Sequence, residues 1–212
     1  MNRGVTFGFK DETFWADMFK DHAQFIGAMA ATLSNDRLTT MCEVAESECR
    51  NWNSHGFDTI LQHMLILTES VLAASTNAQD VELLTHMREE TMYVSEMHSR
   101  GGVSLIYAHE FWKNNFIEHF ELLLSAWKDK ARSSNNAIDN SIVDRLEYAL
   151  TLLRRENMRN VYAIDNNTIA FLYSILTDLR HFVVPVDLKL YKMAQHEYKE
   201  MKYGLKQLHI SA

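Results

Sequence analysis

The sequence predicts an all-α fold made of two tandem antiparallel four-helix bundles that are related by an internal duplication. Apolar residues recur at spacings of three and four along nearly the whole chain, which is the period of an amphipathic helix. The 212 residues include only 7 Gly and 1 Pro, and a β-sandwich or β-barrel needs many more turn residues than that. A third observation is that the two halves of the chain repeat the same short motifs.

The first half of the chain is expected to form four helices, over about residues 11–33, 36–52, 58–74 and 80–100. Residues 34–36, Ser-Asn-Asp, start the second helix, because such side chains accept hydrogen bonds from the exposed N–H groups of a first turn. Gly101 and Gly102 are the strongest break in the chain. They set the expected domains at residues 1–102 and 103–212.

The second half is expected to form four more helices, over about residues 105–131, 140–158, 166–183 and 186–208. A polar loop is expected over residues 133–140. Pro185 is placed at or near the first position of the last helix, where its missing N–H costs least. Because all the connections are short, consecutive helices are expected to pack as antiparallel neighbours.

Composition and charge exclude several classes of protein. Hydrophobic residues make up 47% of the chain and charged residues 23%, which is typical of a protein with a core and not of a disordered one. A net charge of −7 works against binding to the phosphates of nucleic acids. No apolar run approaches the ~18 residues of a membrane span, and the first residues lack the apolar stretch of a secretory signal. We therefore expect a cytoplasmic protein with no nucleic-acid or membrane partner. Cys42 and Cys49 are expected to be buried thiols, because seven residues of helix separate them by ~10 Å, too far for a disulfide.

The repeat is carried by aromatic, histidine and acidic residues on the first and last helices of each half. The matched pairs are Phe14 and Phe111, Trp15 and Trp112, His22 and His119, His86 and His196, Glu90 and Glu200, and Tyr93 and Tyr203. The offset grows from 97 residues on the first helix to 110 on the last. Because the added length falls at the predicted loop over residues 133–140, we interpret the pattern as duplication of a four-helix unit.

The repeated polar residues predict a metal site in at least one of the two bundles. The expected ligands are His22, Glu69, His86 and Glu90 in the first half, and His119, Asp178, His196 and Glu200 in the second. In an up-down-up-down bundle, counting residues along the helices brings each set to one height, and residues four apart share a helix face. Imidazole and carboxylate ligands suit a divalent metal, with iron or manganese favoured over zinc. The second bundle has the shorter Asp178 in place of Glu69, so the first bundle is expected to hold a metal at least as tightly.

Two alternatives need no metal. The same side chains can form a buried hydrogen-bond network, with His86 and Glu90 paired and Tyr93 donating its hydroxyl. The glutamates can also simply face water. Six histidines without a repeated partner are expected at the surface or as hydrogen-bonded core residues: His55, His63, His98, His109, His181 and His209.

The repeated motifs resemble an uncharacterised family of tandem ferritin-like four-helix bundles known from spore-forming bacteria. The resemblance covers about residues 11–208 and rests on Phe-Trp followed by an acidic residue and His, and on H-x-x-x-E-x-x-Y in the last helix of each half. It implies two bundles and bound metal but brings no established activity. The E-x-x-H motif of ferritins is missing at the matched positions, so iron storage and radical chemistry are not carried over.

Three functions are compatible with the pattern. The first is a metal-binding protein with redox or oxygen chemistry at a non-haem iron or manganese centre, acting on an unknown small molecule. Catalysis would also need an open coordination position, so an enzymatic role stays open. The second is a non-catalytic structural or interaction module with polar core layers, and the third is a haem or small-ligand pocket. Aromatic residues on the first helix predict a homodimer, with packing between the bundles as the alternative.

Overall fold

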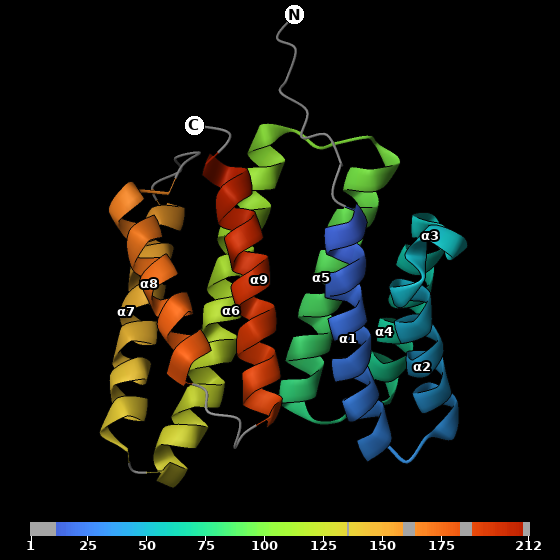
Figure 1. Ribbon diagram of the computed structural model, residues 1–212, viewed down its shortest axis with the longest axis horizontal. Coiled ribbons are helices and arrows are strands. Elements are labelled where there is room, and N and C mark those ends of the chain that lie inside the picture. The colour runs from blue at the N-terminus through green and yellow to red at the C-terminus, as the bar shows by residue number, and fades with distance from the viewer. Residues whose placement is uncertain (1–11, 135, 159–163, 183–187, 210–212) are drawn as a thin grey trace, which may run out of the picture. The chain divides into compact units, whose positions relative to one another are not determined.

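The computed structural model describes residues 12–134, 136–158, 164–182 and 188–209 (Figure 1). Over these residues the chain forms nine α-helices and no strand, so the expected all-α fold is confirmed. The chain divides into two compact units, Met1–Ser104 and Leu105–Ala212. None of the described helices is both long and apolar enough to cross a membrane.

The first unit contains four long helices and one short one. They are α1 (Glu12–Thr32), α2 (Asp36–Arg50), α3 (Trp52–His55), α4 (Phe57–Ala74) and α5 (Ala78–Ser99). Helix α1 packs against α2, α4 and α5, and α4 also packs against α2 and α5. Helix α2 ends at Arg50, two residues before the predicted end, and the short helix α3 occupies residues 52–55, most of which were expected to be a break. Gly56 follows α3 with a φ of +82°, which suits only glycine without strain. Asn35 caps α2 by accepting a hydrogen bond from the N–H of Leu38, at 3.2 Å.

The core of the first unit follows one face of α1. Trp15, Phe19 and Ile26 are fully buried there, at the spacing of a helix face. Gly27 allows α2 to approach, since a Cβ at that position would lie 3.3 Å from the Cβ of Cys42. Cys42 and Cys49 are free and buried, as expected. Burial raises the pKa of the Cys42 thiol to about 11 and that of Cys49 to about 12.

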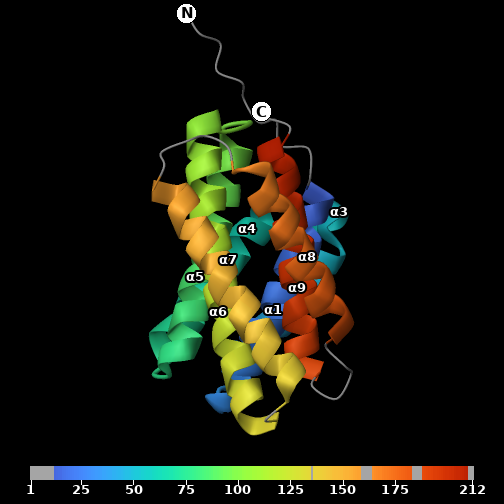
Figure 2. The same cartoon turned by 90° about the vertical axis from the view of Figure 1, so that its left-hand side faces the viewer.

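The second unit contains four helices: α6 (Leu105–Ser134), α7 (Ala137–Met158), α8 (Asn166–Phe182) and α9 (Leu188–His209). Helix α6 lies beside α7 and α9, and α8 packs against α7 and α9, so each helix has two neighbours (Figures 1 and 2). The polar loop expected over residues 133–140 is shorter than predicted. Ser134 donates a hydrogen bond to Asp139 at 2.6 Å, and Asn136 accepts one from the N–H of Ile138, so helical structure resumes at Ala137. Pro185 lies outside the described residues.

The core of the second unit repeats that of the first. Trp112, Phe116 and Leu123 of α6 are fully buried at the positions that correspond to the core residues of α1. The Phe-Trp pairs have the same geometry in both units, with ring centroids 5.3 Å apart and an interplanar angle of 78°. Gly204 of α9 lies directly on the Trp112 ring, because a Cβ there would come within 2.3 Å of Cε3. The absence of a side chain at Gly204 therefore sets how closely α9 can approach α6.

Candidate metal sites

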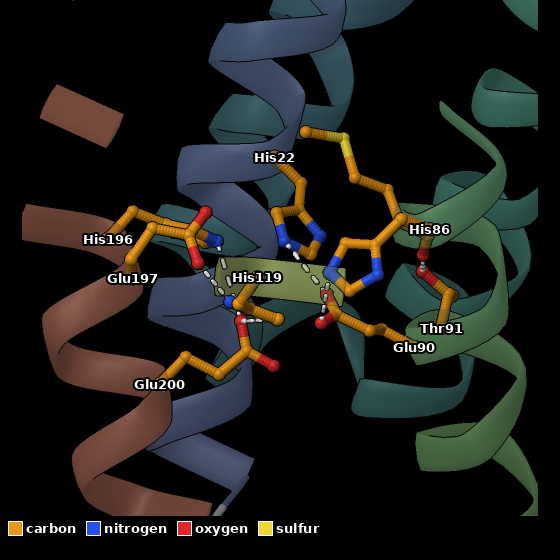
Figure 3. A network of polar contacts seen from close by, with 9 residues as sticks. His22, His86, Glu90, Thr91, His119, His196, Glu197 and Glu200 are labelled. Atoms are coloured by element: carbon orange, nitrogen blue, oxygen red, sulfur yellow. Dashed lines mark hydrogen bonds and ion pairs between the residues drawn. The ribbon is translucent and has the colours of Figure 1, made fainter. Parts of the chain in front are cut away.

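In the first unit, α1 and α5 bring His22, His86 and Glu90 together (Figure 3). His22 lies on the same face of α1 as Trp15 and Phe19, and His86 and Glu90 are one turn apart on α5. The Nε2 atom of His22 is 3.3 Å from Oε2 of Glu90, and Nε2 of His86 is 2.9 Å from Oε1. One buried carboxylate thus contacts two imidazoles, one through each oxygen. All three residues are at most 6% exposed.

In the second unit, α6 and α9 bring together the equivalent residues and one further carboxylate (Figure 3). The Nε2 atoms of His119 and His196 lie 3.7 Å and 3.5 Å from Oε2 of Glu200. The other ring nitrogen of His119, Nδ1, forms a hydrogen bond with Oε2 of Glu197. All four residues are at most 4% exposed, so two carboxylates and two imidazoles share a buried site.

Two of the contacts in the second unit are longer than ordinary hydrogen bonds. An N–H···O hydrogen bond spans about 2.7–3.2 Å, and both Nε2 atoms are farther than that from Oε2 of Glu200. Two neighbouring ligand atoms bonded to one divalent ion at about 2.1 Å lie about 3.0 Å apart in octahedral geometry and about 3.4 Å apart in tetrahedral geometry. The distances of 3.5 Å and 3.7 Å are somewhat longer than both separations. In the first unit, the 2.9 Å contact between His86 and Glu90 has the length of an ordinary hydrogen bond.

Glu69 and Asp178 lie apart from these clusters, contrary to expectation. Glu69 is exposed and its carboxylate is 3.2 Å from Nε of Arg88. Asp178 is half-buried and pairs with Arg145 of α7. The residue count considered only the height of each residue along its helix and ignored rotation, which is about 100° per residue. The preceding Thr68 takes the inward position on α4 and is fully buried. The expectation that the first bundle binds metal at least as tightly therefore loses its basis.

Glu197 was not among the ligands expected from the repeat. Those ligands were repeated residues, and the residue of the first half at the same offset of 110 is Met87. A non-repeated signal was available, because Glu197 lies three residues before Glu200 and therefore shares its helix face.

The six histidines without a repeated partner take varied positions. His55 and His63 are exposed, as expected of surface residues. His109 of α6 is buried, and its pKa is lowered by desolvation and, to a smaller extent, by the charge of Lys113. Two of the histidine side chains lie outside those that the structure describes: His181 and His209.

Comparison with known proteins identifies no relative of this chain. No protein-family model, curated protein or solved structure matches the chain. The resemblance to ferritin-like tandem bundles therefore stays a prediction from short motifs.

Proposed function

We propose that this protein binds a divalent metal ion, iron or manganese rather than zinc, in tandem ferritin-like four-helix bundles. The observation that carries the proposal is the buried set of His119, His196 and Glu200, in which the Nε2 atoms of both imidazoles lie 3.5–3.7 Å from the same carboxylate oxygen. Two histidines and one carboxylate form the ligand set of many non-haem iron sites. His22, His86 and Glu90 make up the corresponding set of the first unit.

Burial supports the metal on energetic grounds. An ionised carboxylate removed from water costs several kcal/mol unless a cation or several hydrogen bonds compensate it. Glu200 and Glu197 are both buried beside the same imidazole, His119. A divalent ion at Nε2 of His119 would offset the second negative charge of this pair. Iron or manganese held there would supply redox chemistry with oxygen or peroxide, for which the protein residues would provide ligands and a water-poor surrounding.

A metal-free polar network is the second candidate, and one observation favours it for the first unit. The 2.9 Å contact between His86 and Glu90 is a good hydrogen bond that needs no ion. In that case the polar layer would specify how the helices pack, at some cost in stability. The protein would then be a structural or interaction module.

Metal content separates the two candidates. The full chain, purified without a histidine tag from medium containing iron, manganese and zinc, is expected to retain about one metal ion or more per chain. Glu200→Gln is expected to lower this content, because an amide is a weaker ligand than a carboxylate. Glu69→Gln and Asp178→Asn are matched controls, since both remove an acidic group that was a predicted ligand but lies at an arginine instead.

The proposal fails if the wild-type chain holds less than ~0.1 ion and is not stabilised against heat by added Fe²⁺, Mn²⁺ or Zn²⁺, because a ligand that binds the native state must raise its stability. It also fails if the two control substitutions remove as much metal as Glu200→Gln.

A further inference from the structure

Glu197 is the one acidic residue in the second cluster that the duplication does not explain. It follows His196 on α9, is 4% exposed and forms a hydrogen bond with Nδ1 of His119. The other ring nitrogen of His119, Nε2, faces Glu200 at 3.7 Å. His119 therefore lies between two carboxylates that contact opposite sides of its ring (Figure 3).

This arrangement fixes how His119 can act as a ligand. An ionised carboxylate only accepts hydrogen bonds, so its contact with Glu197 places the ring proton on Nδ1. The lone pair is then on Nε2, the nitrogen that faces Glu200 and His196. Metal-binding histidines commonly donate their second N–H to a carboxylate in this way, which fixes the orientation of the ring and increases the basicity of the ligand nitrogen.

The first unit has a different residue at the corresponding position. Met87 occupies it, and this residue is buried at 2% exposure. A thioether is a weak hydrogen-bond acceptor and carries no charge. Met87 therefore cannot do for His22 what Glu197 does for His119. The duplicated units thus differ at this buried position, which follows His86 in the first unit and His196 in the second.

We propose that Glu197 is a positioning residue that makes the second unit the tighter of the two metal sites, by fixing the tautomer and orientation of His119. This inference rests on the proposed metal binding. Removing such an outer carboxylate typically weakens metal affinity by 10- to 100-fold. The same change is expected here for Glu197→Met, which installs the residue of the first unit.

The test uses Mn²⁺ alone as the probe and the full chain as the protein. In a Glu90→Gln background, which removes the shared carboxylate of the first cluster, equilibrium dialysis measures the dissociation constant of the second site. Glu197→Met is expected to raise that constant by about 10- to 100-fold. Glu197→Gln is expected to raise it less, because its amide oxygen still accepts the Nδ1 hydrogen. The absorption spectrum of Co²⁺ at the same site is expected to change with Glu197→Met and to be largely restored in Glu197→Gln.

The reverse exchange is expected to increase Mn²⁺ affinity, whereas a substitution that only damages the structure would decrease it. In a Glu200→Gln background, Met87→Glu is expected to tighten Mn²⁺ binding at the first site. Thermal unfolding of each variant without metal checks that it folds. If Mn²⁺ binds the Glu90→Gln chain and neither Glu197 variant changes its affinity, Glu197 has no positioning role, although metal binding stands. If the wild-type chain does not bind Mn²⁺, Fe²⁺ or Zn²⁺ at all, the proposed function itself is wrong.

Discussion

The contact between Gly204 and Trp112 leads to a quantitative prediction for Gly204→Ala. An alanine Cβ would lie 2.3 Å from Cε3 and 2.6 Å from Cζ3 of the indole ring, whereas carbon atoms pack best at about 3.5–4.0 Å. The ring is 1% exposed and packs against Phe116 and Tyr203, so it has little room to move. Overpacking of this kind costs about 1–3 kcal/mol, and we expect the upper end of that range.

Alanine also has a compensating effect. Gly204 lies within α9 and has no positive φ, so replacing it gains about 1 kcal/mol of helix propensity. The net expected loss is about 2 kcal/mol, or a decrease in Tm of roughly 5–15 °C. Gly27→Ala is the matched control, because its Cβ would lie 3.3 Å from the Cβ of Cys42 and needs only a small shift. We expect its free energy of unfolding to change by less than about 1 kcal/mol.

Urea and thermal unfolding followed by circular dichroism measure both variants. Trp112→Phe is expected to relieve part of the loss in the Gly204→Ala chain, since the smaller ring removes the atoms that clash. The double variant should then lose less free energy of unfolding than the sum of the losses in the two single variants. If Gly204→Ala is as stable as the wild-type chain, α9 does not approach α6 as described, and the account of the second core is wrong.

Four further outcomes are expected. Glu69→Gln and Asp178→Asn should each change the free energy of unfolding by less than about 1 kcal/mol, because ion pairs whose side chains remain partly open to water contribute little; urea titration checks this, and a larger loss would mean that these residues have a structural role. Cys42 and Cys49 should react slowly with an aromatic disulfide reagent at pH 8 in the folded chain, because burial raises their pKa values to about 11 and about 12; rapid labelling without unfolding would contradict their burial. Since these raised values exceed the ordinary thiol value of 9.0, the unfolded chain loses protons first as pH rises, and stability should fall above pH 9; stability that is constant between pH 9 and 11 would refute the shifts. Metal removal by a chelator should lower Tm, because an ion at 100 times its Kd adds about 2.7 kcal/mol to the stability; an unchanged Tm would count against a bound ion.

Helix period and breaker residues were sufficient to predict the class of fold. The apolar spacing located all the long helices, since each buries one face and that face is visible in the sequence. The boundaries were less accurate where capping geometry decides them. Asn77 illustrates the point, because its side chain accepts hydrogen bonds from Gln79 and Asp80, so α5 begins at Ala78, two residues before the predicted start.

The candidate ligands could be predicted only in part. His22, His86 and Glu90, with their equivalents in the second half, were identified from repetition, and they do meet within their units. Glu69 was wrongly placed in the same layer, because the height of a residue along a helix does not determine which way its side chain faces. Glu197 was missed because it is not repeated in the first half, so repetition could not identify it.

The most direct test of metal binding at the second cluster is anomalous X-ray diffraction from a crystal of the full chain grown with Mn²⁺, recorded above and below the manganese absorption edge. The account predicts an anomalous peak that marks a Mn²⁺ ion bound to Nε2 of His119, Nε2 of His196 and Oε2 of Glu200, at about 2.0–2.2 Å from each atom. A fully formed cluster with no anomalous peak, in crystals that contain Mn²⁺, would contradict it.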